Sequence, residues 1–348
     1  MGRKLTQAQI ERYHRDGFVY PINAFAAEEA RRHRRTMEEF EAAQGRELTK
    51  GHNFKPHLLF TWVDEIVHHP AILDAVEDVI GPDIRLFHLS LWPKNAGDPA
   101  YVSWHQDATY FGLEPPLQVT AWVALTDASI EAGCMEVIPG SHKLGQLHHA
   151  EHSEAINNLL SRGQTITVEF DKSRTEFMPL RAGQLSLHHT HLAHNSRPNL
   201  SADRRIGLGL SFIPTCVRCI SRTRLTAMLV RGTDRYGHFD DEPRPRVDFG
   251  AAERAAHTDA VARFRASNAE QTSRYASARD RDGPKTRSSL IPHLLELRAA
   301  TDLARLRAAQ GQPLEARKVL APVYGLFTDG ADMADVQDAR AVLAGLDG

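Results

Sequence analysis

Cysteine is scarce in this chain, with 3 residues in 348. So few thiols cannot build a disulfide framework, and they are typical of a reducing compartment, so we expect a cytoplasmic location. Long apolar runs are also missing, because no stretch approaches the roughly 20 residues that a membrane-spanning helix needs. The opening segment, MGRKLTQAQIERYHRDG, has no apolar core of the kind found in secretory signals. The sequence therefore predicts no membrane partner.

Neither sign of charge dominates, since 42 Lys and Arg against 44 Asp and Glu leave a net charge of −2. A surface that neutralises nucleic-acid phosphates needs a basic excess, so we expect no nucleic-acid partner and favour a small-molecule substrate. The 42% hydrophobic content is ordinary for a globular domain, and the length allows a sizeable core. Histidine is abundant, at 19 residues, and it is a common ligand for transition metals.

Helices are predicted in the first 80 residues. Thr6 and Gln9 form a capping box that starts the first helix, and Gly17 ends it. A second helix is expected at about 26–43 and a third at 70–80, where Gly81 stops it.

Strands dominate the middle of the chain. Apolar residues alternate with polar or small ones at 118–125 and 206–213, and short strands are also expected at 84–92, 134–138, 165–170 and 184–189. Gly and Pro turns separate these runs, which favours an antiparallel sandwich or jelly roll. We interpret 148–163 as a helical insertion between strands.

The C-terminal part is predicted to be helical. A helix at about 251–268 precedes a polar, charged segment at 277–289, which we interpret as a linker. Apolar stripes then recur at 295–306, 316–323 and 336–346, and this tail resembles a tetratricopeptide-like repeat of bacterial regulators. We expect a domain at 1–284, with its core at about 84–215, and a helical extension at 285–348. Since one such repeat cannot bury its apolar stripes alone, we expect it to dock on the main domain or on another subunit.

The strongest chemical signal is Trp104-His105-Gln106-Asp107. A His and an Asp two residues apart on an extended segment point to the same side, so both can bind one metal ion. A second histidine-rich stretch, LHHTHLAHNSRPN at 187–199, could supply another ligand. Two histidines and one carboxylate hold non-haem Fe(II) and leave three positions open. A surface histidine beside a capping aspartate is the alternative interpretation of the short pattern.

Arg205 begins the predicted strand eleven residues after His194. A guanidinium binds a carboxylate through two parallel hydrogen bonds, which suits a dicarboxylate co-substrate, although a surface ion pair is the alternative. Gly207 and Gly209 would leave one face of this strand free for a ligand. Cys216 and Cys219 form a CxxC without a second pair, so we interpret them as structural thiols.

From about residue 5 to 250 the chain resembles the phytanoyl-CoA dioxygenase family of Fe(II)/2-oxoglutarate oxygenases. The resemblance lies in LTQAQIERYHRDGFVYP, FKPHLLFTW, GPDIRLFHLSLWPK, WHQDATYFGL, VTAWVALTDASIEAGCMEVIPGSHK and HNSRPNLSADRRIGLGLSFIP. It implies a mainly β fold: a double-stranded β-helix (jelly-roll, cupin-like) core with flanking helices. It also implies Fe(II), 2-oxoglutarate as co-substrate, and O2.

The resemblance assigns roles to particular residues. It implies that His105, Asp107 and His194 bind the metal, and that Arg205 anchors the 2-oxoglutarate carboxylate. His194 is chosen among the nearby histidines because it heads the H-x-S-x-P-N run of the family. Four further residues are expected to line the co-substrate pocket: Lys55, Ser90, Gln106 and Trp122. Candidates for substrate contacts are Trp104, Tyr110, Phe111, His189, His191 and Arg197.

The implied reaction is hydroxylation of an unactivated C–H bond of a small molecule, with release of succinate and CO2. Halogenating relatives have Gly or Ala in place of Asp107, so the resemblance favours hydroxylation. Desaturation, epimerisation and ring formation use the same oxidant and remain open. An alternative of another class is a non-catalytic metal- or ligand-binding jelly roll that acts as a sensor or interaction protein through its helical tail.

Overall fold

The structure is a computed structural model, and it forms two compact units, Met1–Thr272 and Ser273–Gly348. It describes residues 2–109, 111–150, 156–160, 163–168, 172–281, 297, 300–301, 303–305, 307–324 and 334–346. The predicted domain boundary between 284 and 285 lies outside the described residues.

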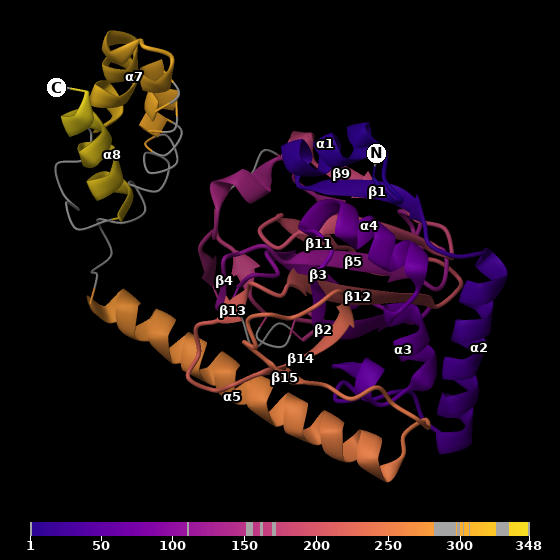
Figure 1. Cartoon of the computed structure of the whole chain (residues 1–348). Helices are drawn as coiled ribbons and strands as arrows, with labels where there is room; N and C mark the ends of the chain where they lie inside the picture. The colour runs from indigo at the N-terminus through magenta and orange to yellow at the C-terminus, as the bar shows by residue number, and fades with distance from the viewer. Residues whose placement is uncertain are drawn as a thin grey trace. The chain divides into compact units, whose positions relative to one another are not determined.

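Two β-sheets form the frame of the first unit (Figure 1), as predicted for a jelly roll. Their described strand pairs are antiparallel except for β14 with β15. In spatial order the large sheet contains β1 (Phe18–Asn23), β10 (Gln184–His189), β5 (Val119–Ala124), β12 (Arg205–Pro214), β2 (Ile84–Lys94), β14 (Thr226–Arg231) and β15 (Asp240–Asp241). The small sheet contains β3 (Val102–His105), β11 (His194–Ser196), β6 (Met135–Val137) and β9 (Glu176–Met178).

Helices cover the outer face of the large sheet, where α4 packs on β5 and β12. Val119, Ala121 and Val123 point into this helix-covered core, whereas Trp122 belongs to a second core between the two sheets. The alternation predicted for this strand is therefore confirmed. The described helices that begin in this unit are α1 (Gln7–Asp16), α2 (Ala27–Gln44), α3 (Thr61–Val67), α4 (Pro70–Ile80) and α5 (Ala251–Arg281), with short 3-10 turns η1 (Pro56–Leu58), η2 (Ser141–Leu144) and η3 (Lys172–Arg174).

The inner face of the large sheet carries a polar row. The strand registers place His188 opposite Thr120, Thr120 opposite Ser211, and Ser211 opposite His88. Because neighbouring paired residues in a sheet point to the same side, these four side chains form one line across β10, β5, β12 and β2. We call this line the inner row.

Several predicted boundaries are confirmed. The side chain of Thr6 accepts from the backbone N–H of Gln9, the Gln9 side chain accepts from the backbone N–H of Thr6, and Gly17 ends α1 in the left-handed conformation. The helix predicted at 70–80 is α4.

In two places the described strands differ from the ranges expected from the sequence. β1 and β14 extend the jelly roll beyond the predicted core at 84–215, and β1 tolerates Pro21 because it lies at the edge of its sheet. In the predicted helical insertion, β7 (His149–Ala150) pairs with β8 (Thr165–Ile166), and the described residues 156–160 form turns and a bridge. A further small pair joins β13 (Arg218–Cys219) to β4 (Leu113–Glu114).

Gly207 makes room for a side chain rather than for a ligand. A Cβ atom there would lie 2.0 Å from Trp122 Cζ2, whereas at Gly209 it would meet Trp92 Nε1 at 3.3 Å. We expect Gly207→Ala to lower the free energy of unfolding by about 1–3 kcal/mol through overpacking, and Gly209→Ala to lower it less. Urea denaturation of both variants checks this, and an equal loss in the two would contradict the assignment.

The second unit contains α7 (Pro313–Tyr324), α8 (Ala334–Gly345) and further helical residues between 297 and 309. Its buried core confirms the stripes predicted at 316–323 and 336–346. The first predicted stripe runs through Leu295, Ala299, Leu303 and Leu306. Of these the structure describes only Leu303, which is 40% exposed, while Leu297, Ala300 and Ala304 are buried. Leu295, Ala299 and Leu306 lie outside the described residues.

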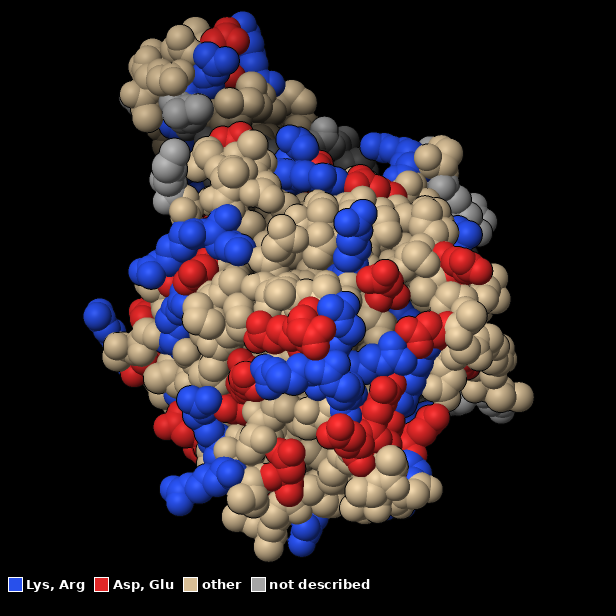
Figure 2. All heavy atoms as spheres, turned by 90° about the vertical axis from the view of Figure 1, so that its right-hand side faces the viewer, with Lys and Arg blue, Asp and Glu red and all other residues tan. Residues whose placement is uncertain are grey.

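The surface over α2 mixes charges of both signs (Figure 2). Arg31 pairs with Glu28 and Arg32 with Glu65, so the basic side chains of this helix have acidic neighbours. Such a face lacks the basic excess that phosphate binding requires. No helix in the described part of the chain is both long enough and apolar enough to cross a membrane.

Candidate metal centre

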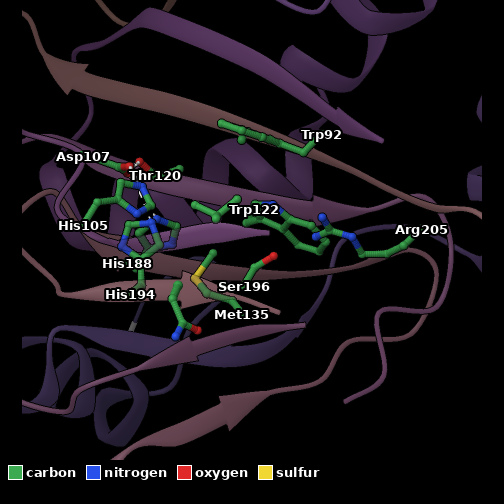
Figure 3. Close-up of a pocket in the computed structure, with 13 residues that line it drawn as sticks. Trp92, His105, Asp107, Thr120, Trp122, Met135, His188, His194, Ser196 and Arg205 are labelled. Carbon is green, nitrogen blue, oxygen red and sulfur yellow. Dashed lines mark hydrogen bonds and ion pairs between the residues drawn. The ribbon is translucent and has the colours of Figure 1, made fainter. Parts of the chain in front are cut away.

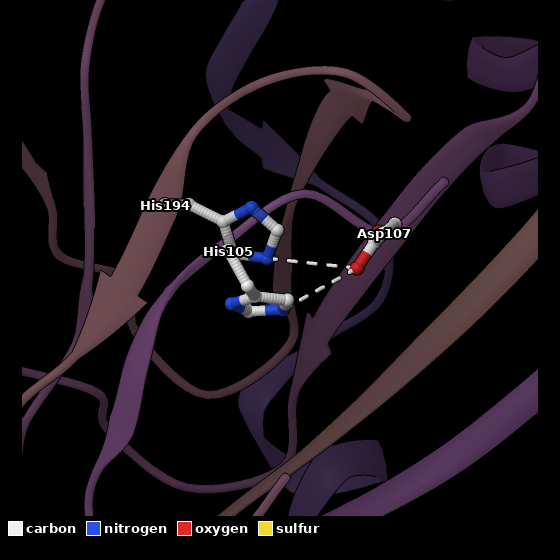
Figure 4. Close-up of side chains that lie close together, drawn as sticks. All are labelled: His105, Asp107 and His194. Carbon is white, nitrogen blue, oxygen red and sulfur yellow. Dashed lines mark ion pairs between the residues drawn. The ribbon is translucent and has the colours of Figure 1, made fainter. Parts of the chain in front are cut away.

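His105 and His194 face each other across two strands of the small sheet. β3 ends at His105, β11 begins at His194, and the antiparallel register pairs these two residues directly. Their ring centroids lie 4.1 Å apart (Figure 4). Residues 89 positions apart in the sequence are thus brought together by backbone pairing, which does not depend on any ligand.

Asp107 lies in the turn after β3, and its carboxylate completes the cluster. Its Oδ1 atom lies 3.6 Å from His105 Nε2 and 3.6 Å from His194 Nε2. The three donor atoms all fall within 4.8 Å of one another. Two imidazoles and one carboxylate are a donor set for a divalent transition metal that leaves positions open.

Both histidines are oriented by their second ring nitrogen. Nδ1 of His105 lies 2.9 Å from the Ser103 carbonyl oxygen, and Nδ1 of His194 lies 2.9 Å from that of Leu192. A carbonyl can only accept, so each Nδ1 donates and each Nε2 keeps its lone pair toward the cluster. Burial, reinforced by neighbouring His105, lowers the pKa of His194 well below its usual range. Imidazoles oriented in this way fit a bound metal ion.

The inner row holds Asp107 from the opposite sheet. Thr120 Oγ1 donates to Asp107 Oδ2 at 2.7 Å, and His188 Nε2 lies 3.3 Å from the same oxygen. Burial raises the pKa of Asp107, but the adjacent imidazoles of His105, His188 and His194 outweigh it, so the pKa lies well below its usual range. The carboxylate is therefore ionised, with Oδ1 directed to the histidines.

Removing the Thr120 hydroxyl should loosen this carboxylate. We expect Thr120→Val to weaken Fe(II) binding about 10- to 100-fold, as loss of a hydrogen bond behind a metal ligand typically does. Thr120→Ser keeps the hydroxyl and should bind Fe(II) within a few-fold of wild type. Anaerobic Fe(II) titration of wild type and the two variants measures the three affinities. Equal affinities for wild type and Thr120→Val would contradict a role of the Thr120 hydroxyl in holding Asp107.

A cavity extends from this cluster between the two sheets (Figure 3). His105, Asp107 and His194 lie at one end and Arg205 at the other, with the Trp122 side chain between them. The remaining lining comes from both sheets and includes Trp92, Val102, Thr120, Met135, His188, Asn195, Ser196 and Gly209.

Arg205 is a buried cation without an acidic partner among the described residues. Its side chain is 3% exposed, and its Nε atom has no hydrogen-bond partner. The guanidinium lies over the Trp122 ring, 5.3 Å from its centroid. Burial lowers the pKa of Arg205 to about 10, so it stays charged at neutral pH. A buried, unpaired guanidinium at the end of a cavity is a site for an anion.

Lys94 is a second buried basic side chain at this end, and sequence reasoning missed it. It pairs with Arg205 in the register of β2 and β12, and its Nζ donates to Ser196 Oγ at 2.5 Å and to the Arg197 carbonyl oxygen at 2.6 Å. Burial, together with the nearby Arg205, lowers the pKa of Lys94 to about 6. The signal was present, since Lys94 lies in the quoted segment GPDIRLFHLSLWPK and Ser196 two residues after His194.

Of the four predicted co-substrate residues, Trp122 lines the cavity and the other three do not. Lys55 Nζ donates to Glu242 at 2.5 Å in a fully buried pair. Gln106 donates to the carbonyl oxygens of Gly145 and His191, and its own oxygen accepts from a backbone N–H. Ser90 pairs with Gly209 in the sheet register, but its hydroxyl is 2.7 Å from His88 Nε2. Their polar groups are already bonded within the protein, so these three lie outside the cavity.

The predicted substrate contacts are also dispersed. Arg197 pairs with Glu136 and lies over the Phe177 ring, while His189 and His191 lie near one another outside the cavity lining. Phe111 packs on Phe87 and His88 close to the inner row. Trp104 is half-buried next to His105, and Tyr110 lies outside the described residues.

A second trio of potential donors, Glu29, His33 and Glu65, lies on α2 and α3. Arg32 already occupies it, with Nη2 at 2.7 Å from Glu65 and 3.3 Å from His33 Nε2. A fixed guanidinium at this position repels a metal cation. The cluster with Asp107 is thus the better candidate among the described residues.

Buried neutral histidines predict sensitivity to acid. Burial lowers the pKa values of His33, His149 and His191 to about 4 and those of His88 and His189 to about 3. Since these folded-state values lie below the unfolded value of about 6.5, their stabilisation is complete above pH 6.5 and is lost as pH falls toward 4. We expect Tm of the metal-free protein to fall steadily across that window.

Circular dichroism melts at constant ionic strength measure this slope. His33→Gln should make the slope shallower, whereas His14→Gln, at an exposed position, should leave it unchanged. A Tm that stays level down to pH 4.5 and then falls with the carboxylates would contradict the prediction.

Known proteins resemble this chain in sequence and in structure. Residues 13–207 match the family model described as phytanoyl-CoA dioxygenase (PhyH). A probable alpha-ketoglutarate-dependent hypophosphite dioxygenase of Stutzerimonas stutzeri is 30% identical over 153 residues, which cover 43% of this chain and 52% of that protein. The chain spans about half the length of the curated relatives it matches.

The similar solved structures include the non-heme monooxygenase ThoJ. Its apo form is 36% identical, with a TM-score of 0.68, and the match covers 76% of this chain and 99% of that one. Its nickel complex is 35% identical over the same shares, with a TM-score of 0.63.

Proposed function

Because the chain belongs to the phytanoyl-CoA dioxygenase family, we propose that it is an Fe(II)- and 2-oxoglutarate-dependent dioxygenase. It hydroxylates an unactivated C–H bond of a small-molecule substrate and releases succinate and CO2. The observation that supports this most strongly is the cavity itself. It has three metal-donor atoms at one end and a buried, unpaired guanidinium at the other.

His105, Asp107 and His194 hold the iron, which supplies the activation of O2 and of the 2-oxoglutarate keto acid. Their fit rests on two imidazoles with oriented Nε2 atoms and one ionised carboxylate. The nickel complex of the similar monooxygenase ThoJ supports a divalent ion in this fold. His188 and Thr120 keep the carboxylate turned toward the histidines.

Arg205 binds the distal carboxylate of 2-oxoglutarate. A bidentate pair would satisfy the guanidinium that has no acidic partner among the described residues. Ser196 Oγ accepts from Lys94, so its own hydrogen remains free to donate to an anion in the cavity. Trp122 stacks against Arg205 and excludes water along the cavity wall.

Asp107 favours hydroxylation over halogenation. Its carboxylate fills the position that would have to be vacant for a halide beside the two histidines. The similarity to the non-heme monooxygenase ThoJ supports the same choice.

Anaerobic titration of the metal-free protein with Fe(II) and then 2-oxoglutarate tests the proposal. A visible metal-to-ligand charge-transfer band and, in air, succinate formation are the expected results. Absence of the band from folded protein would overturn the proposal. It would then favour a non-catalytic ligand-binding jelly roll whose helical tail docks on a partner.

A further inference from the structure

Lys94 is a buried titratable group beside the co-substrate end of the cavity. It lies on β2 and is 0% exposed. Three oxygens surround its Nζ atom: the Ser196 hydroxyl at 2.5 Å, the Arg197 carbonyl at 2.6 Å and the Ser196 carbonyl at 3.4 Å. An ammonium group has three hydrogens for these three acceptors, whereas a neutral amine has two. The geometry around Nζ is therefore that of a protonated lysine.

Arg205 opposes this protonation. The register of β12 and β2 pairs Arg205 with Lys94, and neighbouring paired residues point to the same side of a sheet. Two positive charges placed together away from water repel each other. Burial, together with Arg205, lowers the pKa of Lys94 to about 6, so Lys94 is largely neutral at about pH 7.5.

The other titratable groups near this pair do not restore the missing negative charge. Asp98, in the segment after β2, favours protonation of Lys94 through its charge, but its carboxylate bonds a backbone N–H instead of Nζ. The Cys134 thiol lies near Arg205, and burial raises its pKa to about 11, so it is uncharged at neutral pH. The Arg197 guanidinium already has a carboxylate partner. Among the described residues, no carboxylate forms an ion pair with Lys94.

Ser196 connects Lys94 to the cavity. It lines the cavity together with Arg205 (Figure 3), and its Oγ atom lies 2.5 Å from Lys94 Nζ. A protonated Lys94 donates to this oxygen and leaves the hydroxyl hydrogen free to point at an anion. A neutral Lys94 has a lone pair that can accept the same hydrogen, which turns the oxygen lone pairs of Ser196 toward the cavity. The proton on Lys94 therefore decides whether Ser196 attracts or repels a carboxylate.

We infer that binding of the 2-oxoglutarate dicarboxylate is coupled to the uptake of one proton by Lys94, which turns the Ser196 hydroxyl hydrogen toward the bound carboxylate. This inference rests on the proposed function and adds Lys94 to it as a positioning residue. The proton comes from the solvent and adds to the Nζ lone pair, and no other covalent bond changes. The carboxylate held by Arg205 supplies the negative charge that a second buried cation requires.

The direction of the pH dependence follows from linkage, which is reciprocal. The pKa of Lys94 is about 6 in the free site, and a carboxylate bound nearby raises it. Below about pH 6 Lys94 is already charged, so binding takes up no proton there. Above that value uptake grows, and the dissociation constant of 2-oxoglutarate should increase by up to about tenfold per pH unit between about pH 6.5 and 8. Arg205 stays charged throughout, because its pKa is about 10.

Isothermal titration of the Fe(II)-loaded full chain with 2-oxoglutarate, in the absence of O2, measures the proton uptake. The heats are compared at about pH 7.5 in buffers with different enthalpies of ionisation, such as Hepes and Tris. The slope of the observed enthalpy against the enthalpy of ionisation gives the number of protons. We expect about 0.5–1 proton per bound 2-oxoglutarate in wild type.

Two variants separate Lys94 from other proton acceptors. Lys94→Met keeps the length of the side chain and removes the amine, so it should take up no more than about 0.2 proton, with an affinity that changes little with pH. Lys143→Met removes an exposed lysine of η2 and should take up as many protons as wild type. A purely structural role of Lys94 would lower the Tm of its variant and leave the proton count unchanged.

Proton uptake near zero in wild type would overturn the inference, and this result does not depend on the folding of any variant. Equal uptake by wild type and Lys94→Met would also overturn it, because the proton would then go to another group. The charge-transfer band is recorded in the same samples. A band that forms without uptake by Lys94 ends the coupling and leaves the proposed function intact, whereas loss of both the band and 2-oxoglutarate binding removes both.

Discussion

Asp107→Ala should lose Fe(II) binding by more than about a hundredfold and should form no detectable succinate. Removing a hydrogen bond behind a ligand already costs about 10- to 100-fold, so removing the anionic ligand itself should cost more. The variant would keep the imidazoles of His105 and His194 and would lose the carboxylate whose negative charge offsets that of the metal. Anaerobic Fe(II) titration and succinate formation measure the two losses.

The matched control is Asp127→Ala, which removes an exposed carboxylate that accepts from the Ala182 backbone N–H. It should keep metal affinity and turnover close to wild type. Asp107→Asn tests the contribution of the negative charge alone, because it preserves the size of the side chain. Turnover by Asp107→Ala at the wild-type rate would show that Asp107 is not a metal ligand.

Arg205→Ala should weaken 2-oxoglutarate binding by roughly 30-fold to several thousand-fold, with Fe(II) affinity unchanged. Truncating one partner of a buried charge pair costs about 2–5 kcal/mol, because the other charge is left without a partner. In this variant the distal carboxylate would enter the cavity beside Trp122 with its principal counter-ion missing. The concentration of 2-oxoglutarate that half-saturates the charge-transfer band measures the effect.

The neighbouring residue provides a control for Arg205. Arg204 pairs with Glu41 on the helical side of the sheet, so Arg204→Ala removes an adjacent guanidinium without touching the cavity. It can lower Tm but should leave 2-oxoglutarate affinity unchanged. Arg205→Lys should recover part of the affinity, since lysine keeps the charge and loses the planar fork. An equal loss of 2-oxoglutarate affinity in Arg204→Ala and Arg205→Ala would argue against Arg205 as the anchor of the distal carboxylate.

Local pattern predicted much of the fold. The alternation in β5 and β12 follows from one face packing on helices and the other on the cavity, and the ends of α1 follow from Thr6 and Gly17. The pairing of His105 with His194 could not be derived from spacing, because it depends on the register between strands 89 residues apart. The resemblance to a family supplied that choice.

Three residues that were expected in the co-substrate pocket lie elsewhere for a related reason. Lys55 has the right chemistry for an anion, but its partner Glu242 lies 187 positions away and satisfies it inside the protein. The chain contains many cations, and the fold alone decides which of them lack a counter-ion. Lys94 was missed because its importance depends on lying beside Arg205 in the sheet.

The candidate centre is divided between the two walls of the jelly roll. The small sheet contributes both histidines, while the carboxylate is restrained by Thr120 and His188 of the large sheet. A breathing motion that separates the sheets would pull the carboxylate from the imidazoles without changing any backbone hydrogen bond within either sheet. Packing between the walls, at Cys134 or Met178, could therefore set how long a metal stays bound. Residence time would then be tunable from positions that never touch the ion.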